Sequence, residues 1–465
     1  MTRHVSVKGS SWLRGCVAAA IACALLPAGA AAQGRRGGDI AAALRKADPG
    51  DREVRGFYAG RGYRPLWIQG NRIGPEAERA LELLVTADLD GLDPAAYRPG
   101  EVAKALDRGL ESRNPKALAR AEMMLSRSFA MYLRDVRAPR DASMVYVDQG
   151  LAPQVMTIRG ALEGLARKPS LQAYLDSVGW MHPIYAQLRG ALAEQDAAPR
   201  YRAAGGTDGW EGDQKRLLRL NLERARALPA DPGPRYLLVD AAAARLWMYE
   251  DGRPVDSMKV IVGKATEQTP MMAGLIRFAM TNPFWNIPPD LVKLRVAPGY
   301  LKGGAKFLKA KGYQVTNDWS DEAKVINPAK VDWKAVASGA KELPVRQLPG
   351  KDNAMGRMKF MFPNDLGIYL HDTPEKKLFA SADRRFSSGC VRVEDAPRLA
   401  RWLFGRPLVV KAGGTEKRVD LPAPVPVFIT YLTAAPEGDR IAFRDDAYGR
   451  DRSAGFEGRG ALARR

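Results

Sequence analysis

Residues 236–262 read YLLVDAAAARLWMYEDGRPVDSMKVIV, and this segment sets the architecture of the second half of the chain. It contains runs with the two-residue period of β-strands, separated by small or polar residues. These runs span 236–239, 244–249 and 255–262. The pair Asp251-Gly252 is a hairpin signal between the second and the third run. We therefore predict a β-rich domain that begins near Pro232.

Downstream, the β-rich pattern is interrupted between about 298 and 343, where glycines and lysines occur at helical rather than strand spacing. Strand-like segments return at 358–362 and 367–370. Long insertions of this kind are either functional lids or tolerated additions. We predict one mainly β domain over residues 232–432, with a helical lid inserted at about 298–343.

Upstream, the pattern is mostly helical. Ala77, Ala80 and Leu84, for example, recur at the spacing of one helix face. The remaining predicted segments are a linker at 33–50, a helical domain at 51–200, a connector with a helix at 201–231 and a C-terminal extension at 433–465, frayed from Asp445 onward. The sequence therefore predicts the α+β class, with a helical domain followed by a mainly β domain.

The N-terminus has the features of a cleavable secretory signal peptide over residues 1–32. Basic residues precede an apolar run at 16–26, and small residues at 28–32 form an A-x-A-type cleavage site before Gln33. An uncleaved anchor is the alternative, but the run is short for a membrane span. No later stretch reaches the roughly 18 apolar residues of a span. We predict an exported protein without a transmembrane span after cleavage.

The charge balance is strongly basic, with 72 Lys and Arg against 52 Asp and Glu and a formal charge of +20. Removal of Arg3, Lys8 and Arg14 with the signal peptide lowers this charge by three units, to +17. In an exported protein, such a charge points to anionic surfaces of the cell envelope rather than to nucleic acid. Simple solubility is the alternative explanation.

The cysteines indicate a candidate nucleophile. The chain has 3 Cys and 3 His, and Cys16 and Cys23 leave with the predicted signal peptide. Cys390 then has no partner for an internal disulfide, so it is either an inert core residue or a reactive thiol. His371 precedes it by a short interval and is the natural base, and we expect it to hold the thiol deprotonated. His182 lies between Met181 and Pro183 and is expected to be structural.

The residues before Cys390 have a shape suited to acyl transfer. In Ser387-Ser388-Gly389-Cys390, the pair Ser388-Gly389 lets the backbone turn sharply and point successive N–H groups at one spot. Such groups could hold the oxyanion of a tetrahedral intermediate. Two histidines and one cysteine are a thin supply of metal ligands, so we predict no metal site and no cofactor.

These two segments resemble the L,D-transpeptidases of the bacterial cell wall, which share a YkuD-type catalytic domain. The family signature is a His, followed by Ser-(His or Ser)-Gly-Cys and an Arg, which match His371, 387–390 and Arg392. The likeness extends to further segments of both halves. They include 262–264, 269–270, 282–288, 347–350 and 371–374, and in the first half 57–58, 62–63, 66–67 and 91–94. The pattern is similar to the large periplasmic branch, with an N-terminal scaffold domain and a capping insertion.

The resemblance implies a two-step acyl transfer on peptidoglycan. Cys390 would attack a donor tetrapeptide stem, expel its terminal D-Ala and form a thioester, which the amine of an acceptor stem would resolve as a 3→3 cross-link. His371 would act as base and then as acid. The resemblance also implies a periplasmic location and acylation by carbapenems.

The neighbours of the nucleophile receive supporting roles from the same resemblance. Asp372 and neighbouring carbonyls would orient His371, and the N–H groups of Ser388, Gly389 and Cys390 would form the oxyanion hole. Arg392 would meet a substrate carboxylate or support its loop. Tyr369 and Trp285 would line the substrate pocket, although aromatic residues of a β domain are also common packing residues.

Two departures from the family pattern affect these expectations. Ser388 stands where many relatives have His, so any role of that His is absent. The segment from Tyr201 to Arg226 is too short for the separate peptidoglycan-binding module of many large relatives. Two alternatives to cross-linking remain open: an L,D-carboxypeptidase that hydrolyses the tetrapeptide stem, and a non-catalytic envelope-binding scaffold.

Overall fold

A computed structural model describes residues 3–6, 39–70, 72–138, 140, 142–197, 208–320, 322–411 and 413–453. The chain divides into two compact units. The helical unit contains residues 1–142, 152–231 and 432–465, and the sheet unit contains residues 143–151 and 232–431. Apart from 3–6, the predicted signal peptide and its cleavage site lie outside the described residues, so export stays a prediction.

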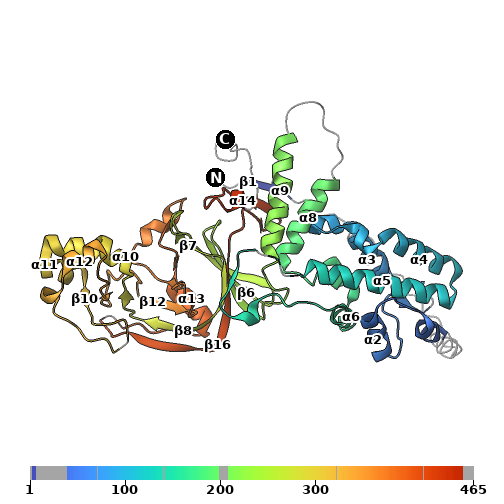
Figure 1. The fold of residues 1–465 in the computed structure, drawn as a ribbon, viewed down its shortest axis with the longest axis horizontal. Helices are drawn as coiled ribbons and strands as arrows, with labels where there is room; N and C mark the ends of the chain where they lie inside the picture. The colour runs from blue at the N-terminus through green and yellow to red at the C-terminus, as the bar shows by residue number, and fades with distance from the viewer. Residues whose placement is uncertain are drawn as a thin grey trace, which may run out of the picture. The chain divides into compact units, whose positions relative to one another are not determined.

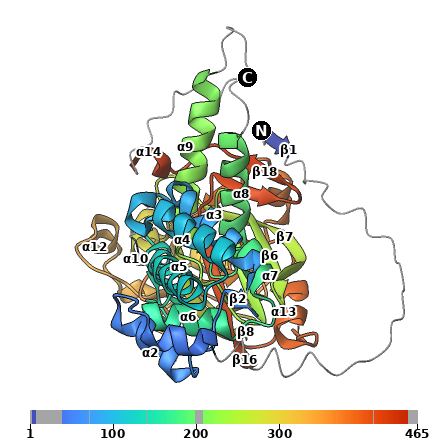
Figure 2. The ribbon, with the colours of Figure 1, turned by 90° about the vertical axis from the view of Figure 1, so that its right-hand side faces the viewer.

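The helical unit is built around its longest helix, α5, which packs against α3, α4 and α6 (Figures 1 and 2). Its helices are α2 (Arg52–Gly60), α3 (Pro75–Val85), α4 (Pro99–Ser112), α5 (Pro115–Val136), α6 (Ile158–Ala166), α7 (Leu171–Asp176), α8 (Pro183–Ala197) and α9 (Asp208–Ala225). Residues 39–46 are also helical. Short 3-10 turns, η1 (Ala87–Asp90) and η2 (Pro94–Tyr97), and a small hairpin, β2 (Ile68–Gln69) with β3 (Arg72–Ile73), connect them.

Local sequence explains where these helices begin. Asp51 accepts hydrogen bonds from the first-turn N–H groups of α2, and Asn114 caps α5 through Lys116 N, with Pro115 at the first helical position. One face of α5 is buried, and it includes Phe129 and Tyr132 in an aromatic cluster with Trp180. The predicted helical domain is therefore present.

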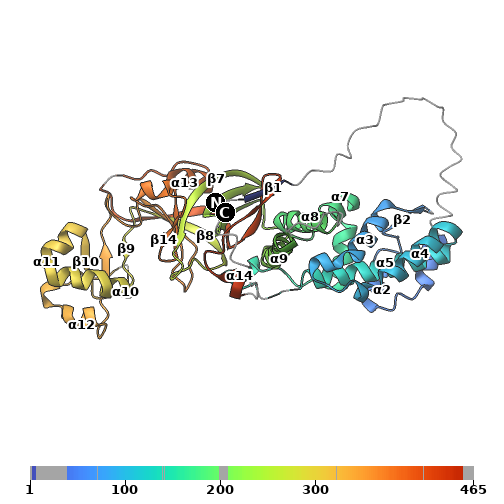
Figure 3. The same ribbon diagram turned by 90° about the horizontal axis from the view of Figure 1, so that it is seen from above.

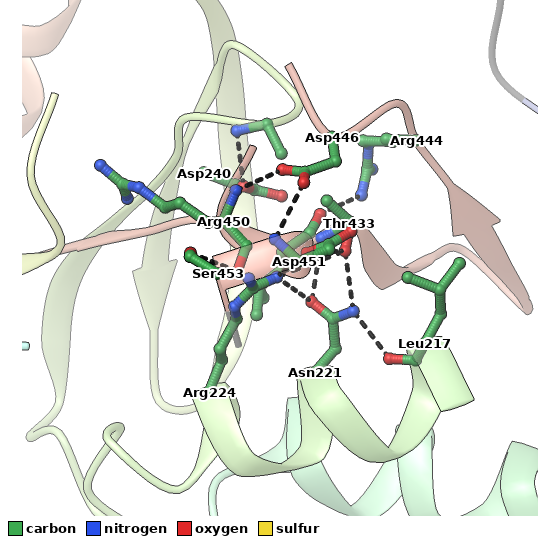
Figure 4. A network of polar contacts seen from close by, with 12 residues as sticks. Leu217, Asn221, Arg224, Asp240, Thr433, Arg444, Asp446, Arg450, Asp451 and Ser453 are labelled. Atoms are coloured by element: carbon green, nitrogen blue, oxygen red, sulfur yellow. Dashed lines mark hydrogen bonds and ion pairs between the residues drawn. The ribbon is translucent and has the colours of Figure 1, made fainter. Parts of the chain in front are cut away.

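The C-terminal segment belongs to the helical unit. It contains β17 (Ala434–Glu437), β18 (Arg440–Phe443) and α14 (Arg450–Ser453), and β1 (Arg3–Ser6) pairs with β18. Asp451 is buried and forms an ion pair with Arg224 of α9 at 2.6 Å, and Thr433 is hydrogen-bonded to Asn221 (Figure 4). The expectation of fraying from Asp445 onward is wrong for residues 445–453, because these buried polar contacts hold them against α9.

The sheet unit begins with β5 (Arg235–Asp240), β6 (Arg245–Glu250) and β7 (Arg253–Gly263), which confirm the strands predicted over 236–262. The other strands are β4 (Val145–Tyr146), β8 (Met272–Thr281), β12 (Met358–Met361), β13 (Leu370–His371), β14 (Arg385–Ser387), β15 (Val391–Val393) and β16 (Lys417–Thr430), and α13 (Ala396–Phe404) follows β15. The order is β12-β13-β15-β7-β6-β5-β16-β8-β4, and β12 also pairs with β8. This second pairing closes the sheet on itself, which removes exposed edges.

The inserted segment forms a separate lobe with its own apolar core (Figure 3). Its elements are β9 (Trp285–Asn286), α10 (Pro289–Leu291), the π-helical turn η4 (Val292–Val296), α11 (Ala297–Lys311), β10 (Tyr313–Val315), η5 (Pro328–Lys330), α12 (Trp333–Ser338) and β11 (Val345–Gln347). The lobe is longer than the predicted 298–343. Ile287 and Val345 are buried in its core, so both boundaries lie outside the prediction.

The α+β prediction is confirmed, because a helical region precedes a mainly β unit. In the part of the chain that the structure describes, no helix combines the length and the apolar character that crossing a bilayer requires.

Candidate active site

Two short parallel strands bring the predicted nucleophile and base together. β13 pairs with β15 in the register His371↔Arg392, and Val391 N–H donates to Tyr369 O at 3.1 Å. Side chains alternate between the faces of a strand, and residues paired across neighbouring strands point to the same face. Tyr369, His371, Cys390 and Arg392 therefore share one face of the sheet.

Cys390 lies at the start of β15 and is only partly buried. Its Sγ donates to Gly367 O at 3.4 Å. Burial raises the pKa of the thiol to about 11, although hydrogen bonds from Tyr369 and the positive charges of Arg392 and Lys359 act in the opposite direction. The thiol is therefore neutral in the resting protein.

His371 is 2% exposed, and its Nδ1 lies 2.6 Å from Asp372 O. A carbonyl oxygen only accepts hydrogen bonds, so Nδ1 carries the proton and Nε2 keeps a lone pair. Burial lowers the pKa of the imidazole to about 3, and the positive charge of Arg392 acts in the same direction. The ring meets Tyr369 edge-on, with centroids 5.7 Å apart. His371 is thus a neutral ring whose free nitrogen can accept a proton.

These protonation states correct one expectation. The sequence led us to expect a thiol that His371 holds deprotonated, but burial disfavours the charged form of both groups. The resting pair is a neutral thiol beside a neutral imidazole. The proton must therefore move during nucleophilic attack, with His371 acting as a general base.

The turn before Cys390 requires glycine. Gly389 has φ of +108°, and a Cβ there would lie 3.1 Å from Ile368 Cδ1. The turn is held on both sides: Thr269 Oγ1 donates to Gly389 O at 2.7 Å, and Ser387 Oγ donates to Cys390 O at 2.6 Å. A backbone fixed in this way presents its N–H groups in one geometry, as an oxyanion hole needs.

The N–H groups of the turn differ in whether they already donate a hydrogen bond. Gly389 N–H donates to Ser387 Oγ at 3.3 Å, which is a long hydrogen bond. Among the hydrogen bonds of the described residues, none uses the N–H of Cys390. Ser388 is exposed, and its side chain is hydrogen-bonded to Glu267, which pairs with Lys264 at 2.6 Å. Of the predicted donors, the N–H groups of Ser388 and Cys390 donate none of the hydrogen bonds found among the described residues, so both are available to a new acceptor.

Asp372 orients His371 through its main chain. The carbonyl oxygen contacts the imidazole, whereas the buried carboxylate accepts from Arg357 N at 2.9 Å and from Lys376 Nζ at 2.7 Å. A Cβ on Gly356 would lie 2.5 Å from the Asp372 carboxyl carbon, so the backbone packs tightly there. The carboxylate thus fixes the strand end that carries the orienting carbonyl.

The predicted substrate-binding residues separate into two groups. Arg392 Nη1 donates to Glu375 Oε2 at 2.5 Å, which places its charge on the loop that follows β13. Trp285 lies in β9, opposite Gln347 of β11, and its described contacts are with the core of the inserted lobe. Tyr369 and Arg392 therefore share the strand face of the nucleophile, whereas Trp285 packs against the core of the inserted lobe.

Sequence reasoning missed two residues of this neighbourhood. Thr269 is fully buried and links two segments, because its hydroxyl also accepts from Gly263 N at 2.8 Å. Lys359 of β12 stands opposite His371 in the sheet, and its Nζ donates to Phe284 O at 3.2 Å. Thr269 stands in one of the segments that resemble the family, but nothing in the sequence assigned it a role at the site. Lys359 had no such signal, because it reaches the site through strand pairing.

Comparison with known proteins finds a matching family model in each half of the chain. The family model for the L,D-transpeptidase catalytic domain matches residues 234–427, and the model for the scaffold domain matches residues 52–192. Residues 234–427 are an L,D-transpeptidase catalytic domain. This domain contains both His371 and Cys390, and the scaffold domain corresponds to helices of the helical unit. The resemblance read from the motifs is confirmed at this level.

Individual relatives extend the comparison. A curated protein of Haemophilus influenzae named "Putative L,D-transpeptidase" is 33% identical over 256 residues, a match that covers 52% of this chain and 49% of that protein. The chain thus spans about half the length of this curated relative.

Two solved structures are also similar: the Ldtfm-avibactam carbamoyl enzyme and a cysteine-to-serine mutant of the Enterococcus faecium L,D-transpeptidase. Both are 14% identical with a TM-score of 0.21; they cover 44% and 43% of this chain, and the matches cover 51% and 52% of those chains. Values this low carry no conclusion for the site.

Proposed function

We propose that this protein is a peptidoglycan L,D-transpeptidase that forms 3→3 cross-links through a thioester on Cys390. The observation that carries the proposal is the shared strand face of His371 and Cys390, within an L,D-transpeptidase catalytic domain. The partners are a donor tetrapeptide stem and an acceptor stem. No step requires a metal or a cofactor.

The first half-reaction follows from the protonation states of the site. His371 Nε2 accepts the Cys390 proton while Sγ attacks the carbonyl carbon at the L-centre of diaminopimelate. The carbonyl oxygen becomes an oxyanion that the Cys390 N–H can stabilise. When the tetrahedral intermediate collapses, the C–N bond breaks and His371 returns the proton to the departing D-Ala amine. A thioester remains on Cys390.

The second half-reaction reverses these roles. The side-chain amine of an acceptor stem attacks the thioester carbon, and His371 accepts a proton from that amine. The C–S bond then breaks, the cross-link forms, and Sγ regains its proton from His371. If water takes the place of the amine, the same site acts as an L,D-carboxypeptidase.

Incubation with purified tetrapeptide muropeptides, followed by mass spectrometry, tests the proposal. We expect cross-linked dimers, released D-Ala and a thioester-mass adduct on intact protein, all of them abolished by Cys390→Ala. Tripeptide monomers without dimers would establish hydrolysis instead. Full cross-linking by Cys390→Ala would refute the role of Cys390 as nucleophile and favour a non-catalytic envelope-binding scaffold. A mass increase on Cys390 after incubation with a carbapenem is an independent readout of the nucleophile.

We also propose a periplasmic location, on the basis of the signal-peptide features of residues 1–32. N-terminal sequencing of the protein from a periplasmic fraction should begin at Gln33. An intact N-terminus on membrane-bound protein would instead favour an uncleaved anchor.

A further inference from the structure

A large cavity lies in the helical unit, entirely within its own residues. Its volume is about 1150 Å³, and its walls are the helix at 39–46, the start of α4 and one face of α5. The cavity is open to solvent, since Lys116 and Arg120 in its lining are exposed, and pockets that bind small ligands have volumes of about 300–1,000 Å³. The cavity is therefore large enough for an oligopeptide.

The α5 wall combines positive charge with flexible apolar side chains. Lys116, Arg120, Met124, Arg127 and Met131 recur at intervals of three or four residues, so they lie on one face of the helix. Methionine adapts its shape to different apolar partners. The same wall can thus contact both carboxylates and small apolar groups.

Four cations of the cavity lining have no carboxylate partner among the described residues. Within the described residues, no carboxylate pairs with Lys46, Lys116, Arg120 or Arg127, and the Arg127 Nε is buried without a hydrogen bond. Lys116 and Arg120 also stand four residues apart, where like charges destabilise a helix. The arrangement costs stability in the free protein, and a bound anion would remove that cost.

The carboxylates around the cavity do not cancel this charge. Asp48 is engaged with Arg55 at 2.7 Å, and Glu101 lies 3.6 Å from Arg98. Asp39 is the remaining carboxylate of the lining. The cavity therefore keeps a positive balance that suits a ligand with more than one carboxylate.

The spacing of the cations fits an extended peptide. Arg120 and Arg127 are one heptad apart, which corresponds to about 10 Å along a helix axis. Carboxylates three residues apart in an extended chain are separated by a similar distance, about 10 Å. A small side chain between those carboxylates would meet Met124, and one beyond the second carboxylate would meet Met131. A short acidic peptide with alanine-like side chains matches the wall in charge and in spacing.

We infer that this cavity is a second, non-catalytic binding site for the carboxylate-bearing stem peptides of the cell wall. The choice of ligand rests on the proposed function, since a cross-linking enzyme encounters such stems in large excess. The site would hold the protein on its polymeric substrate.

Binding of the free tetrapeptide stem to the full chain carrying Cys390→Ala tests this inference, because acyl transfer is then blocked. Methyl-labelled methionines report each site by NMR: Met124 and Met131 for the cavity, and Met361, which lies on the same face of β12 as Lys359, for the active site. We expect the stem to shift the Met124 and Met131 signals. Adding Arg120→Gln and Arg127→Gln should raise the dissociation constant for this site about tenfold.

The matched control removes equal charge from the neighbouring helix. Lys104 and Arg108 are exposed residues of α4 outside the cavity, so Lys104→Gln with Arg108→Gln should leave the affinity unchanged. Equal affinity in both double variants would overturn the inference. So would methyl shifts at Met124 and Met131 caused by vesicles of anionic phospholipid but not by the stem. Shifts at Met361 alone would refute the cavity site and leave the proposed function standing.

Discussion

At the scale of single residues, the electrostatics of the site depend on a partly buried lysine. Lys359 stands opposite His371, its side chain is 13% exposed, and its charge lowers the pKa of both His371 and Cys390. Glu416 lies 3.8 Å from its ammonium group and offsets part of this charge. The lysine thus favours the thiolate that forms during attack and disfavours a protonated base.

Replacement of this lysine by an uncharged side chain of similar length should slow the reaction of the Cys390 thiol with alkylating reagents. In Lys359→Met, the pKa of Cys390 rises further, because the cation is lost and Glu416 is left unopposed. We expect alkylation of Cys390 by iodoacetamide at pH 8 to slow by roughly threefold to tenfold, with the midpoint of its pH profile moved upward. Lys377→Met, an exposed neighbour, should behave as wild type. An unchanged pH profile in Lys359→Met would show that the charge of Lys359 does not influence the pKa of Cys390.

At the scale of elements, the catalytic turn depends on a contact from the loop between β7 and β8. Thr269 bridges Gly263 N and Gly389 O, at 2.8 and 2.7 Å. Thr269→Val removes both of these hydrogen bonds, at a cost of about 1–3 kcal/mol in stability. The turn should then lose the backbone geometry that stabilises an oxyanion.

Two reactions of the same thiol separate this effect from a general loss of reactivity. Acylation by a carbapenem passes through an oxyanion, whereas alkylation by iodoacetamide does not. We expect Thr269→Val to slow carbapenem acylation by tenfold or more, on the order of one oxyanion-hole donor, and to leave alkylation nearly unchanged. Thr269→Ser keeps the hydroxyl and should restore acylation. Equal slowing of both reactions would show that Thr269 acts on the thiol itself.

The elements also show what the sequence could and could not predict. The strands over 236–262 follow from local alternation, and they appear as β5, β6 and β7. The boundaries of the inserted lobe depend on which residues its core buries, such as Ile287, and no local period marks them. Cys390 and His371 could be proposed because their residue types are scarce in the chain. Lys359 reaches the site through strand register, which sequence spacing does not specify.

At the scale of the whole molecule, stability should depend on pH through the helical unit. Glu122 is buried, and Tyr58 Oη donates to it at 2.5 Å. Burial raises the pKa of its carboxyl from 4.5 to about 7, so the stability it contributes is complete below pH 4.5 and is lost as the pH rises to 7. His182 acts oppositely: burial lowers its pKa from 6.5 to about 3, so its contribution is lost as the pH falls below 6.5.

The contributions of Glu122 and His182 to stability change with pH in opposite directions within the helical unit. Removing the Glu122 contribution should therefore expose the pH dependence that it opposes. Glu122→Gln keeps an acceptor for Trp67 N but cannot ionise, so its stability relative to wild type should rise by about 2–3 kcal/mol between pH 4.5 and pH 8. Urea unfolding followed by circular dichroism at both pH values measures this change. Glu78→Gln, which alters an exposed carboxyl of α3, should keep a constant difference from wild type. A constant difference for Glu122→Gln as well would mean that Glu122 stays ionised in the fold, with its hydrogen bonds outweighing the cost of burial.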